Sequence, residues 1–207
     1  EFEIIDGFEE ARLTLLAVQY ALKREKIDSK KFILLDIGGG STEIIVNTNN
    51  SYKAHSFDFG IVTMTQKYLK SHDLYNDLRN RKVEIKTFLD SLNIEDLKNY
   101  SFVATAGTPT TIAAIKLGQD FFSYDKNVIN GTVVDLEDLD YCLDIFKNST
   151  EEEISRLVGR GRVEFIEVGI LIYQTIFEVL NKKESIVLDD GLREGVAIDY
   201  CLKCKKI

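Results

Sequence analysis

The sequence predicts a mixed α/β fold in which one sheet carries flanking helices. Two strand-like apolar runs, residues 32–36 and 44–46, stand on either side of three consecutive glycines. The second run is β-branched, so a hairpin is indicated rather than a strand followed by a helix. Later apolar strands alternate with segments of helical periodicity. The 207 residues are 44% hydrophobic, which suits one large domain or two small ones.

The first expected elements are a short strand at residues 2–5 and a helix that runs to about residue 24. Asp6 is placed to cap this helix, and Glu9 follows three residues later in the capping-box position. Glu10 projects about 100° away from Glu9 around the helix axis, so it is left free for chemistry. A charge that only complements the helix dipole is the alternative for Glu10. The predicted buried face is formed by Ala11, Leu15, Val18 and Leu22.

After the hairpin, strands and helices are expected to alternate up to the carboxyl end. The predicted strands cover residues 52–59, 101–105 and 185–188. The predicted helices cover residues 61–69, 73–92, 110–117, 135–147, 151–158, 163–181 and 192–202. The helix at 163–181 is apolar over most of its surface, so we expect it to be central, and Gly169 allows a neighbour to pack closely.

The glycine turn has the residue types of a phosphate site. Backbone amides at Gly38, Gly39 and Gly40 can approach phosphoryl oxygens closely because no Cβ intervenes. The hydroxyls of Ser41 and Thr42 can donate to the same oxygens. The two common nucleotide-binding glycine motifs are disfavoured, since both require a helix after the glycines. A tight hairpin that needs glycine only for its conformation is the alternative.

A metal ligand and a second anion site are predicted near that turn. Asp36, at the end of the strand before the glycines, can hold a hydrated Mg²⁺. Gly107 breaks the strand at 101–105, and Thr108 with Pro109 is expected to start the next helix. The free amides at the amino end of a helix attract anions, so Gly107 and Thr108 are candidate phosphate ligands. An ordinary strand-to-helix turn is the alternative.

The formal net charge of −8 argues against a nucleic-acid partner. A phosphate site must therefore be positive locally, through backbone amides, a metal ion and a few cationic side chains. Arg162 and Arg193 are the two arginines that we predict to contact phosphate. An ion pair with a nearby glutamate is the alternative for each of them.

Nothing in the sequence indicates a membrane partner. No apolar run approaches the roughly 18 residues of a membrane span, and no secretory leader precedes the first predicted elements. The expected location is the cytoplasm. The three cysteines provide no disulfide framework, so free thiols are expected.

Six motifs, taken together, resemble one known family, the exopolyphosphatase and guanosine-pentaphosphate phosphohydrolase family of the actin, hexokinase and Hsp70 ATPase superfamily. They occur in order and extend over nearly the whole chain. The motifs are I-I-D-G-F-E-E-A-R-L at 4–13, D-I-G-G-G-S-T-E at 36–43, A-T-A-G-T-P-T-T at 104–111, I-N-G-T at 129–132, G-R-V-E-F-I-E-V-G at 161–169 and D-D-G-L-R-E-G at 189–195.

The resemblance implies an α/β, ribonuclease-H-like lobe, with residues 1–207 as the second lobe of the two-lobed actin-like architecture. The first lobe of that architecture carries another phosphate loop, a D-x-G-x-N-S sequence, which is missing here. The chain alone is therefore expected to be inactive. The resemblance also implies that Glu10, the second glutamate of E-E-A-R-L, is the general base.

For the full-length protein the resemblance implies an enzyme that hydrolyses phosphoanhydride bonds. The expected substrates are inorganic polyphosphate and the 5′-triphosphate of guanosine pentaphosphate, attacked in line by water. Mg²⁺ near Asp36 and Glu43 is the implied cofactor. The other expected partners are the missing lobe and, for the full-length protein, a second copy in a homodimer. A non-hydrolytic binding module for polyphosphate or alarmone and a kinase-like or chaperone-like ATPase are the alternatives.

Overall fold

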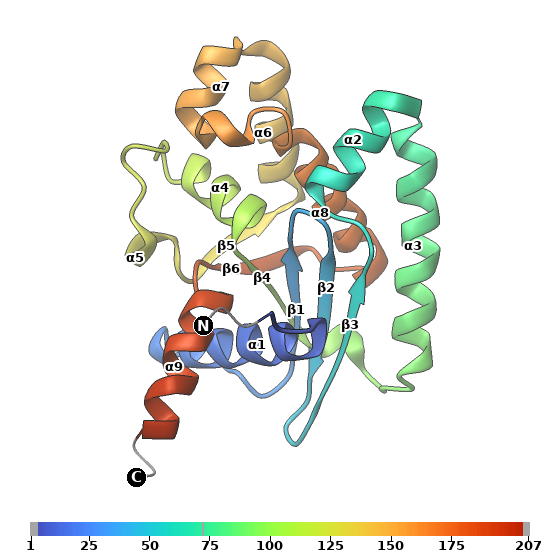
Figure 1. The fold of residues 1–207 in the computed structure, drawn as a ribbon, viewed down its shortest axis with the longest axis vertical. Helices are drawn as coiled ribbons and strands as arrows, with labels where there is room; N and C mark the ends of the chain where they lie inside the picture. The colour runs from blue at the N-terminus through green and yellow to red at the C-terminus, as the bar shows by residue number, and fades with distance from the viewer. Residues whose placement is uncertain (1–3, 72, 205–207) are drawn as a thin grey trace.

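The protein is organised around one mixed, six-stranded sheet in the order β3-β2-β1-β4-β6-β5 (Figure 1). The computed structural model describes residues 4–71 and 73–204. Strand β1 pairs in parallel with β4, and β4 with β6, while β2, β3 and β5 run antiparallel to their neighbours. The strands are β1 (Phe32–Ile37), β2 (Thr42–Asn47), β3 (Tyr52–Phe57), β4 (Ser101–Thr105), β5 (Thr132–Asp135) and β6 (Glu184–Leu188).

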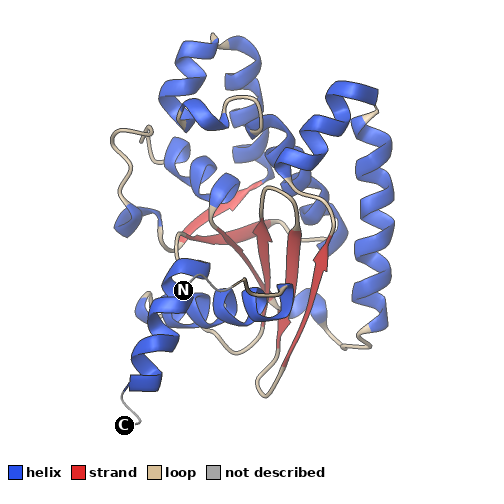
Figure 2. Cartoon of the chain, in the orientation of Figure 1, coloured by secondary structure: helices blue, strands red, loops and turns tan. Residues whose placement is uncertain are grey.

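Helices cover both faces of the sheet and produce three layers (Figure 2). On one face α1 packs against β1, β2, β4 and β6 in a core that includes Leu22, Phe32 and Val103. The remaining helices except α9 lie toward the opposite face, whose larger core includes Ile85, Ile112 and Phe177. The α-helices are α1 (Gly7–Arg24), α2 (Ile61–Ser71), α3 (Leu74–Ser91), α4 (Gly107–Lys116), α5 (Lys126–Ile129), α6 (Leu136–Asn148), α7 (Glu151–Val158), α8 (Ile166–Leu180) and α9 (Leu192–Cys204).

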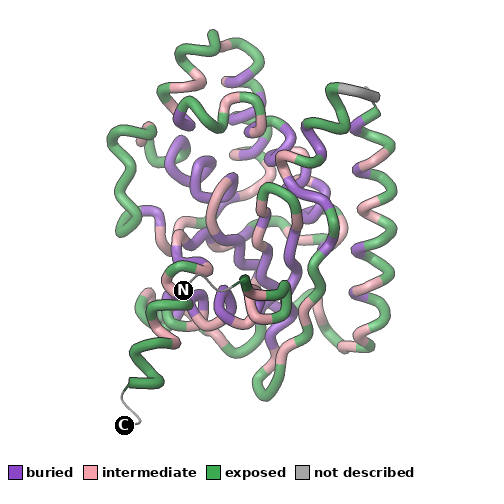
Figure 3. Tube along the Cα trace, in the orientation of Figure 1, coloured by how far each residue is buried: buried purple, intermediate pink, exposed green. Residues whose placement is uncertain are grey.

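Helix α8 is the central helix of the larger core, as its apolar sequence predicts. Tyr173 and Phe177 are fully buried in it, and the buried residues gather along the strands and the helices that pack on them (Figure 3). A Cβ on Gly169 would stand 2.2 Å from the Thr108 hydroxyl oxygen, so only glycine lets α8 approach α4 this closely. On the other face, a Cβ on Gly195 of α9 would stand 2.0 Å from the Leu13 carbonyl oxygen of α1.

Most predicted elements are present, with displaced ends. The strand expected at 2–5 lies partly outside the described residues, and Ile4 and Ile5 form no strand. The third strand ends at Phe57, two residues early, and the helix expected from residue 163 begins at Ile166 because Arg160–Arg162 form a 3₁₀ turn (η2). The edge strand β5 and the short helix α5 were not predicted, since four residues are too few for a periodic pattern.

Helix α4 begins three residues earlier than its sequence pattern predicts. Its cap is Ala106 rather than Thr108, and Pro109 is the third helical residue instead of the first. Ala106 holds φ 54° and ψ 177°, a backbone region that side chains with a Cβ rarely adopt. Gly107 follows with φ +50°, so the turn from β4 into α4 is tighter than an ordinary capped start.

None of the helices in the described residues has the length and apolar composition required to cross a membrane. Cys142 is buried, whereas Cys201 and Cys204 are exposed on α9, and all three are free.

Candidate functional site

The candidate site lies at the edge of the sheet where β1, β4 and β6 end. Because these strands are parallel, their carboxyl ends meet at one edge, where ligands of open α/β sheets bind. The turn between β1 and β2 lies at the same edge, between α2 and α4 (Figure 1). A Cβ on Gly107 would stand 3.5 Å from the Ile37 carbonyl oxygen, so the start of α4 adjoins the glycine turn.

The glycine turn is held in place through its carbonyl groups. The amides of Ile61 and Val62 at the start of α2 donate to the carbonyls of Gly38 and Gly39, at 3.0 and 2.9 Å. A Cβ on Gly60 would stand 2.5 Å from the Gly38 oxygen, so glycine is required there for α2 to reach the turn. Gly39 and Gly40 are exposed, and their amides donate to no acceptor within the described residues. Those amides are therefore available to a ligand.

Neither folding nor packing explains why glycine occupies positions 39 and 40. The left-handed glycines of the described chain are Gly107, Gly118, Gly131 and Gly159, so the turn glycines do not need positive φ. A Cβ on Gly40 would meet nothing within 4 Å, and one on Gly39 would make an ordinary 3.5 Å contact with Val62. A hairpin that needs glycine at 39 and 40 for its conformation is thus disfavoured, and the absence of Cβ atoms leaves room for a ligand to approach the backbone.

The two hydroxyls after the glycines differ. Ser41 is partly exposed beside the turn, and its carbonyl accepts from the Gly38 amide at 2.9 Å. Thr42 is fully buried, and its hydroxyl donates to the Phe59 carbonyl at 2.8 Å. The prediction that the Thr42 hydroxyl donates to phosphate is therefore wrong, because its only proton is used to hold β2 against the segment before α2.

Three carboxylates gather on the side of the sheet that α1 covers. Asp36 and Glu43 are register partners across β1 and β2, so they project to the same face. Burial and the charges of Glu43 and Glu10 raise the pKa of Asp36 to about 7. Burial, then the Glu43 charge, raises the pKa of Glu10 on α1. Glu43 is buried and accepts from the Ser56 hydroxyl at 2.6 Å. The cluster therefore carries uncompensated negative charge.

The Glu9 carboxylate is hydrogen-bonded, but to a side chain and not to the predicted backbone amide. Asp6 caps α1 by accepting from the Glu9 amide at 2.8 Å, as expected. The Glu9 carboxylate, however, accepts from both Nε and Nη2 of Arg12 at 2.7 Å instead of reaching back to the cap amide. Arg12 thereby lowers the pKa of Glu9. Glu9 and Glu10 thus differ, since one is neutralised by a cation and the other faces two further carboxylates.

The acidic cluster suits Mg²⁺ better than a metal that needs a full protein cage. Within residues 4–71 and 73–204, no three His, Cys, Asp or Glu side chains are arranged to hold a metal ion. Mg²⁺ is commonly bound through one or two carboxylates, with water and substrate phosphates completing its octahedron. Asp36 and Glu43 provide two such carboxylates, and their mutual repulsion with Glu10 favours a cation beside them.

The predicted second phosphate site at the start of α4 is mostly used by the fold itself. Thr108 is buried and packs against Gly169, and the hydroxyls of Thr110 and Thr111 donate to the Gly107 carbonyl at 3.0 and 3.1 Å. Gly107 itself is partly exposed. The side chain of Thr108 is therefore directed into the helix interface, and only backbone groups remain for an anion.

The two predicted arginines lie on different elements, η2 and α9. Arg162 of η2 is exposed, and its Nη1 donates to the Thr111 hydroxyl at 3.3 Å, so it reaches the first turns of α4. Arg193 is exposed on α9 and acts electrostatically on Asp189. Among the described residues neither arginine forms an ion pair, so local glutamates do not occupy them.

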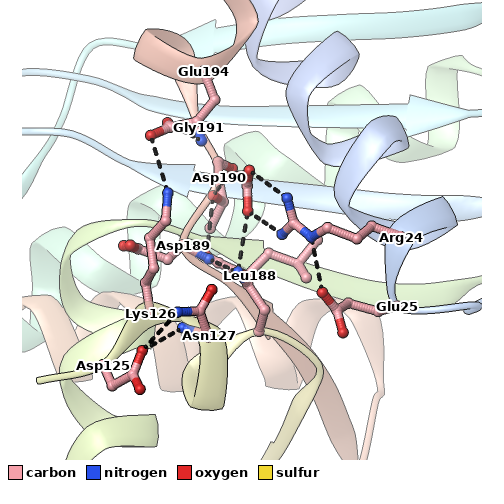
Figure 4. A network of polar contacts seen from close by, with 12 residues as sticks. Arg24, Glu25, Asp125, Lys126, Asn127, Leu188, Asp189, Asp190, Gly191 and Glu194 are labelled. Carbon is pink, nitrogen blue, oxygen red and sulfur yellow. Dashed lines mark hydrogen bonds and ion pairs between the residues drawn. The ribbon is translucent and has the colours of Figure 1, made fainter.

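A polar network that the sequence did not indicate secures the end of β6. Arg24 of α1 contacts both oxygens of buried Asp190, at 2.7 and 3.3 Å, and Lys126 lies opposite Glu194 (Figure 4). Asn130, in the I-N-G-T motif, donates to Asp190 at 3.2 Å and accepts from the Asp189 amide at 2.7 Å. Arg24 and Asp190 are 166 residues apart, so no local pattern could predict their contact. The I-N-G-T motif was the one sequence signal that included a residue of this network.

Tyr124 was also missed by the sequence analysis. Its phenol lies beside the side chains of Thr110 and Asp189, and Arg162 is close enough to act on it electrostatically. Burial, with Asp189 nearby, raises the pKa of Tyr124. Tyr124 therefore connects the loop before α5 to the start of α4 and to the end of β6. An isolated tyrosine in a polar loop has no pattern that would reveal this position.

Comparison with known proteins places this arrangement among phosphatases. A model of the Ppx/GppA phosphatase family matches residues 1–204. Exopolyphosphatase 2 of Mycobacterium tuberculosis is 26% identical over 207 residues, covering 95% of this chain and 63% of that protein. The guanosine-5′-triphosphate,3′-diphosphate pyrophosphatase of Vibrio atlanticus is 28% identical over 205 residues, covering 96% of this chain and 39% of that protein.

A solved structure agrees with these sequence matches. The Aquifex aeolicus Ppx/GppA family member superposes with a TM-score of 0.77 at 30% identity, covering 97% of this chain and 64% of that chain. The predicted family resemblance and the predicted actin-like α/β fold are both confirmed. The chain spans between 30% and 63% of the length of the curated relatives it matches.

Proposed function

We propose, from the premise that the chain belongs to the Ppx/GppA phosphatase family, that it supplies one half of a phosphohydrolase active site. The full-length protein would remove the terminal phosphate of inorganic polyphosphate or of the 5′-triphosphate of guanosine pentaphosphate. The proposal extends to this chain what the names of two relatives state about those proteins.

The main support for the proposal comes from the β1–β2 turn. The exposed amides of Gly39 and Gly40 donate to no acceptor in the part of the chain that the structure describes, and neither φ nor packing demands glycine at these positions. Peptide amides on a turn without side chains form a concave anion site. Amides that are already fixed by the contacts of α2 need no reorganisation when charge develops on a phosphoryl oxygen. The turn therefore fits the equatorial oxygens of a transferred phosphoryl group.

Glu10 is the proposed general base. It lies on the first turn of α1, and its pKa is raised by burial and by Glu43, which makes its carboxylate a better proton acceptor than an ordinary glutamate. Glu10 would orient a water molecule toward the bound phosphate and accept its proton. No covalent intermediate is required, because phosphoryl transfer needs mainly positioning and charge stabilisation.

Asp36 and Glu43 are the proposed Mg²⁺ ligands. When bound beside them, Mg²⁺ would neutralise the negative charge of the cluster and of the substrate phosphates. Arg162 and Arg193, which form no ion pair within the described residues, are the proposed cationic contacts of the phosphates. With these cations and Mg²⁺ in place, the negative charge of the carboxylate cluster would be offset locally although the chain carries a net charge of −8.

The second half of the site is proposed to come from another lobe. The glycine turn and the acidic cluster lie at one open edge of the sheet, and the chain covers 64% of the matched Aquifex aeolicus chain. The D-x-G-x-N-S phosphate loop expected from the superfamily is absent from the 207 residues. Residues 1–207 alone are therefore expected to release little phosphate.

Phosphate release by the full-length protein tests the proposal. With Mg²⁺ present, we expect release from long-chain polyphosphate or guanosine pentaphosphate to exceed release from ATP. Preferential turnover of ATP would favour a kinase-like or chaperone-like ATPase. Tight binding of polyphosphate without release would favour a binding module. Robust multiple turnover by residues 1–207 alone would show that the missing loop is dispensable.

A further inference from the structure

Ser56 of β3 is a polar residue that the proposed function leaves without a role. It is exposed on the edge strand of the sheet, so burial does not require a particular residue there. Its hydroxyl nevertheless donates to Oε1 of Glu43, a residue that is only 4% exposed, at 2.6 Å. A distance of about 2.5–2.7 Å is typical of a hydroxyl that donates to an ionised carboxylate. Ser56 is therefore bonded directly to a proposed Mg²⁺ ligand.

The strand register places Ser56 in line with the acidic cluster. Ser56 pairs with Glu43 across β3 and β2, and Glu43 pairs with Asp36 across β2 and β1. Register partners project to the same face of a sheet, so the three side chains form one row on the face that α1 covers. The start of α1 reaches this row, since a Cβ on Gly7 would stand 3.9 Å from the Ser56 hydroxyl oxygen. The hydroxyl is therefore next to the helix turn that carries Glu10.

Glu43 is the one carboxylate of the cluster that a described residue holds through a hydrogen bond. Asp36 and Glu10 accept no hydrogen bond from the part of the chain that the structure describes. Glu43 accepts one, and Ser56 is its donor. Repulsion between like charges would otherwise turn the Glu43 carboxylate away from its two neighbours. The position of this carboxylate therefore depends on the Ser56 hydroxyl.

The hydrogen bond leaves the two oxygens of Glu43 in different situations. Oε1 accepts from Ser56, whereas Oε2 accepts from no donor within residues 4–71 and 73–204. Oε2 is not among the buried side-chain atoms that lack a partner, so it remains accessible. A carboxylate that is fixed through one oxygen can present the other oxygen to a cation without further rotation.

We propose that Ser56 is a positioning residue, whose hydroxyl holds the Glu43 carboxylate so that Oε2 faces a cation bound beside Asp36. The inference rests on the proposed function, in which Asp36 and Glu43 hold Mg²⁺, and it explains how one of these ligands is kept in place. Ser56 acts through Glu43, because its single proton is already donated there. Groups that hydrogen-bond to metal ligands commonly orient those ligands in this way.

Mg²⁺ titration of the full-length protein tests this role without substrate. The quantity measured is the Mg²⁺ dissociation constant, obtained from the rise in melting temperature with Mg²⁺ concentration. Ser56→Ala should raise this constant about tenfold, because Glu43 loses its orientation. Ser56→Thr keeps the hydroxyl and should behave like wild type, since an exposed position has room for one methyl group. Ser56→Val has nearly the shape of threonine without the hydroxyl and should behave like Ser56→Ala.

Ser51→Ala is the matched control. Ser51 is an exposed serine directly before β3, at the opposite end of that strand from Ser56, and its hydroxyl lies 3.1 Å from the hydroxyl of Thr48. Its loss should leave the Mg²⁺ dissociation constant unchanged. Phosphate release from polyphosphate gives a second readout. In Ser56→Ala the Mg²⁺ concentration for half-maximal rate should rise about tenfold, while the KM for polyphosphate at saturating Mg²⁺ stays close to wild type.

Two results would overturn the inference while leaving the proposed function intact. The first is a Mg²⁺ dissociation constant that is unchanged in Ser56→Ala and Ser56→Val, whatever happens to their melting temperatures. The second is an equal weakening in Ser56→Thr, because the hydroxyl would then not be the cause. Failure of the proposed function has a different signature, in which the wild type itself releases no phosphate or does not respond to Mg²⁺, and the role of Ser56 would fail with it.

Discussion

Two glycine turns meet at the carboxyl edge of the sheet, and the structure uses them differently. The turn between β1 and β2 has ordinary φ values, exposed amides and open space above Gly40. The turn from β4 into α4 holds Ala106 and Gly107 at positive φ, and its threonine side chains are buried or bonded to the Gly107 carbonyl. Both turns contain Gly next to Thr or Ser.

The difference shows how similar glycine motifs separate into binding and folding roles. Glycine in the α4 turn is explained by conformation, since Gly107 has a φ of +50°. Gly39 and Gly40 in the β1–β2 turn have no such explanation, and we propose that a ligand approaches the backbone there. The proposed chemistry is therefore concentrated at the β1–β2 turn and the carboxylates beside it, with the α4 turn contributing rigidity.

The largest effect on activity is expected at Glu10, the proposed general base. Glu10→Gln in the full-length protein should lower kcat by about 10² to 10⁴ while substrate binding is retained, because a general base is lost. Glu9→Gln is the matched control, since it breaks only the pairing with Arg12. It should lower the melting temperature slightly and leave kcat nearly unchanged. The reverse pattern would assign the base to Glu9.

The next effect is a pH dependence at Asp36. Its pKa is about 7 in the fold against 3.8 ordinarily, so the folded state binds the proton more tightly. Asp36 therefore adds stability at low pH, and this contribution is lost as the pH rises through 7. Without metal the loss is at most about 4 kcal/mol, and less where water relaxes around the carboxylate.

Melting curves of the metal-free protein measure this pH dependence. The melting temperature of the wild type should fall between about pH 5 and about pH 8. The melting temperature of Asp36→Asn should fall less, because asparagine does not titrate. Added Mg²⁺ should restore more stability at the higher pH, where it does not compete with the proton. If the melting temperatures of wild type and Asp36→Asn changed equally with pH, the result would contradict the raised pKa of Asp36 among the three carboxylates.

A smaller effect separates the adjacent hydroxyls of Ser41 and Thr42. Thr42→Ala should destabilise the fold by about 1–3 kcal/mol, because the buried Phe59 carbonyl loses its donor. Ser41→Ala should leave the melting temperature unchanged and weaken phosphate binding by about 0.5–3 kcal/mol. Thermal melts and calorimetric titration distinguish the two. Equal behaviour of both variants would show that Thr42 also faces the ligand.

The smallest effect compares one glycine from each turn. Gly107→Ala should cost about 1 kcal/mol of stability, because a residue with a Cβ must adopt positive φ. Gly40→Ala should not destabilise the fold, since its Cβ would enter open space, but should weaken phosphate binding. Denaturant unfolding with calorimetric titration checks both variants. A destabilised Gly40→Ala with unchanged affinity would remove the distinction between the turns.

Local patterns made much of the fold predictable, and they also selected the residues of the candidate site. The hairpin follows from β-branched alternation around glycines, and α7 at Glu151–Val158 matches its prediction because Thr150 and Glu153 form a capping box. What the pattern could not supply was the direction of individual side chains. Nothing in S-T-E distinguishes Ser41 from Thr42, whose hydroxyl is consumed by Phe59, a neighbour only in the fold.

Contacts between distant residues were the other gap in the sequence analysis. Arg24 and Asp190 are far apart in the chain, and their ion pair depends on α1 and β6 meeting at the sheet edge. Tyr124 depends in the same way on a loop returning along α4. Periodicity reports which face of an element is buried, but not which polar groups meet across elements.

Calorimetric titration of polyphosphate into the full-length wild type and Gly39→Val tests the central claim most directly. The valine Cβ would make an ordinary 3.5 Å contact with Val62, so we expect Gly39→Val to fold and to melt close to wild type. Its branched side chain should nevertheless occupy the space above the amides that a phosphoryl oxygen needs, and polyphosphate binding should be lost. A folded Gly39→Val that binds polyphosphate like wild type would contradict the assignment of the β1–β2 turn as the phosphate site.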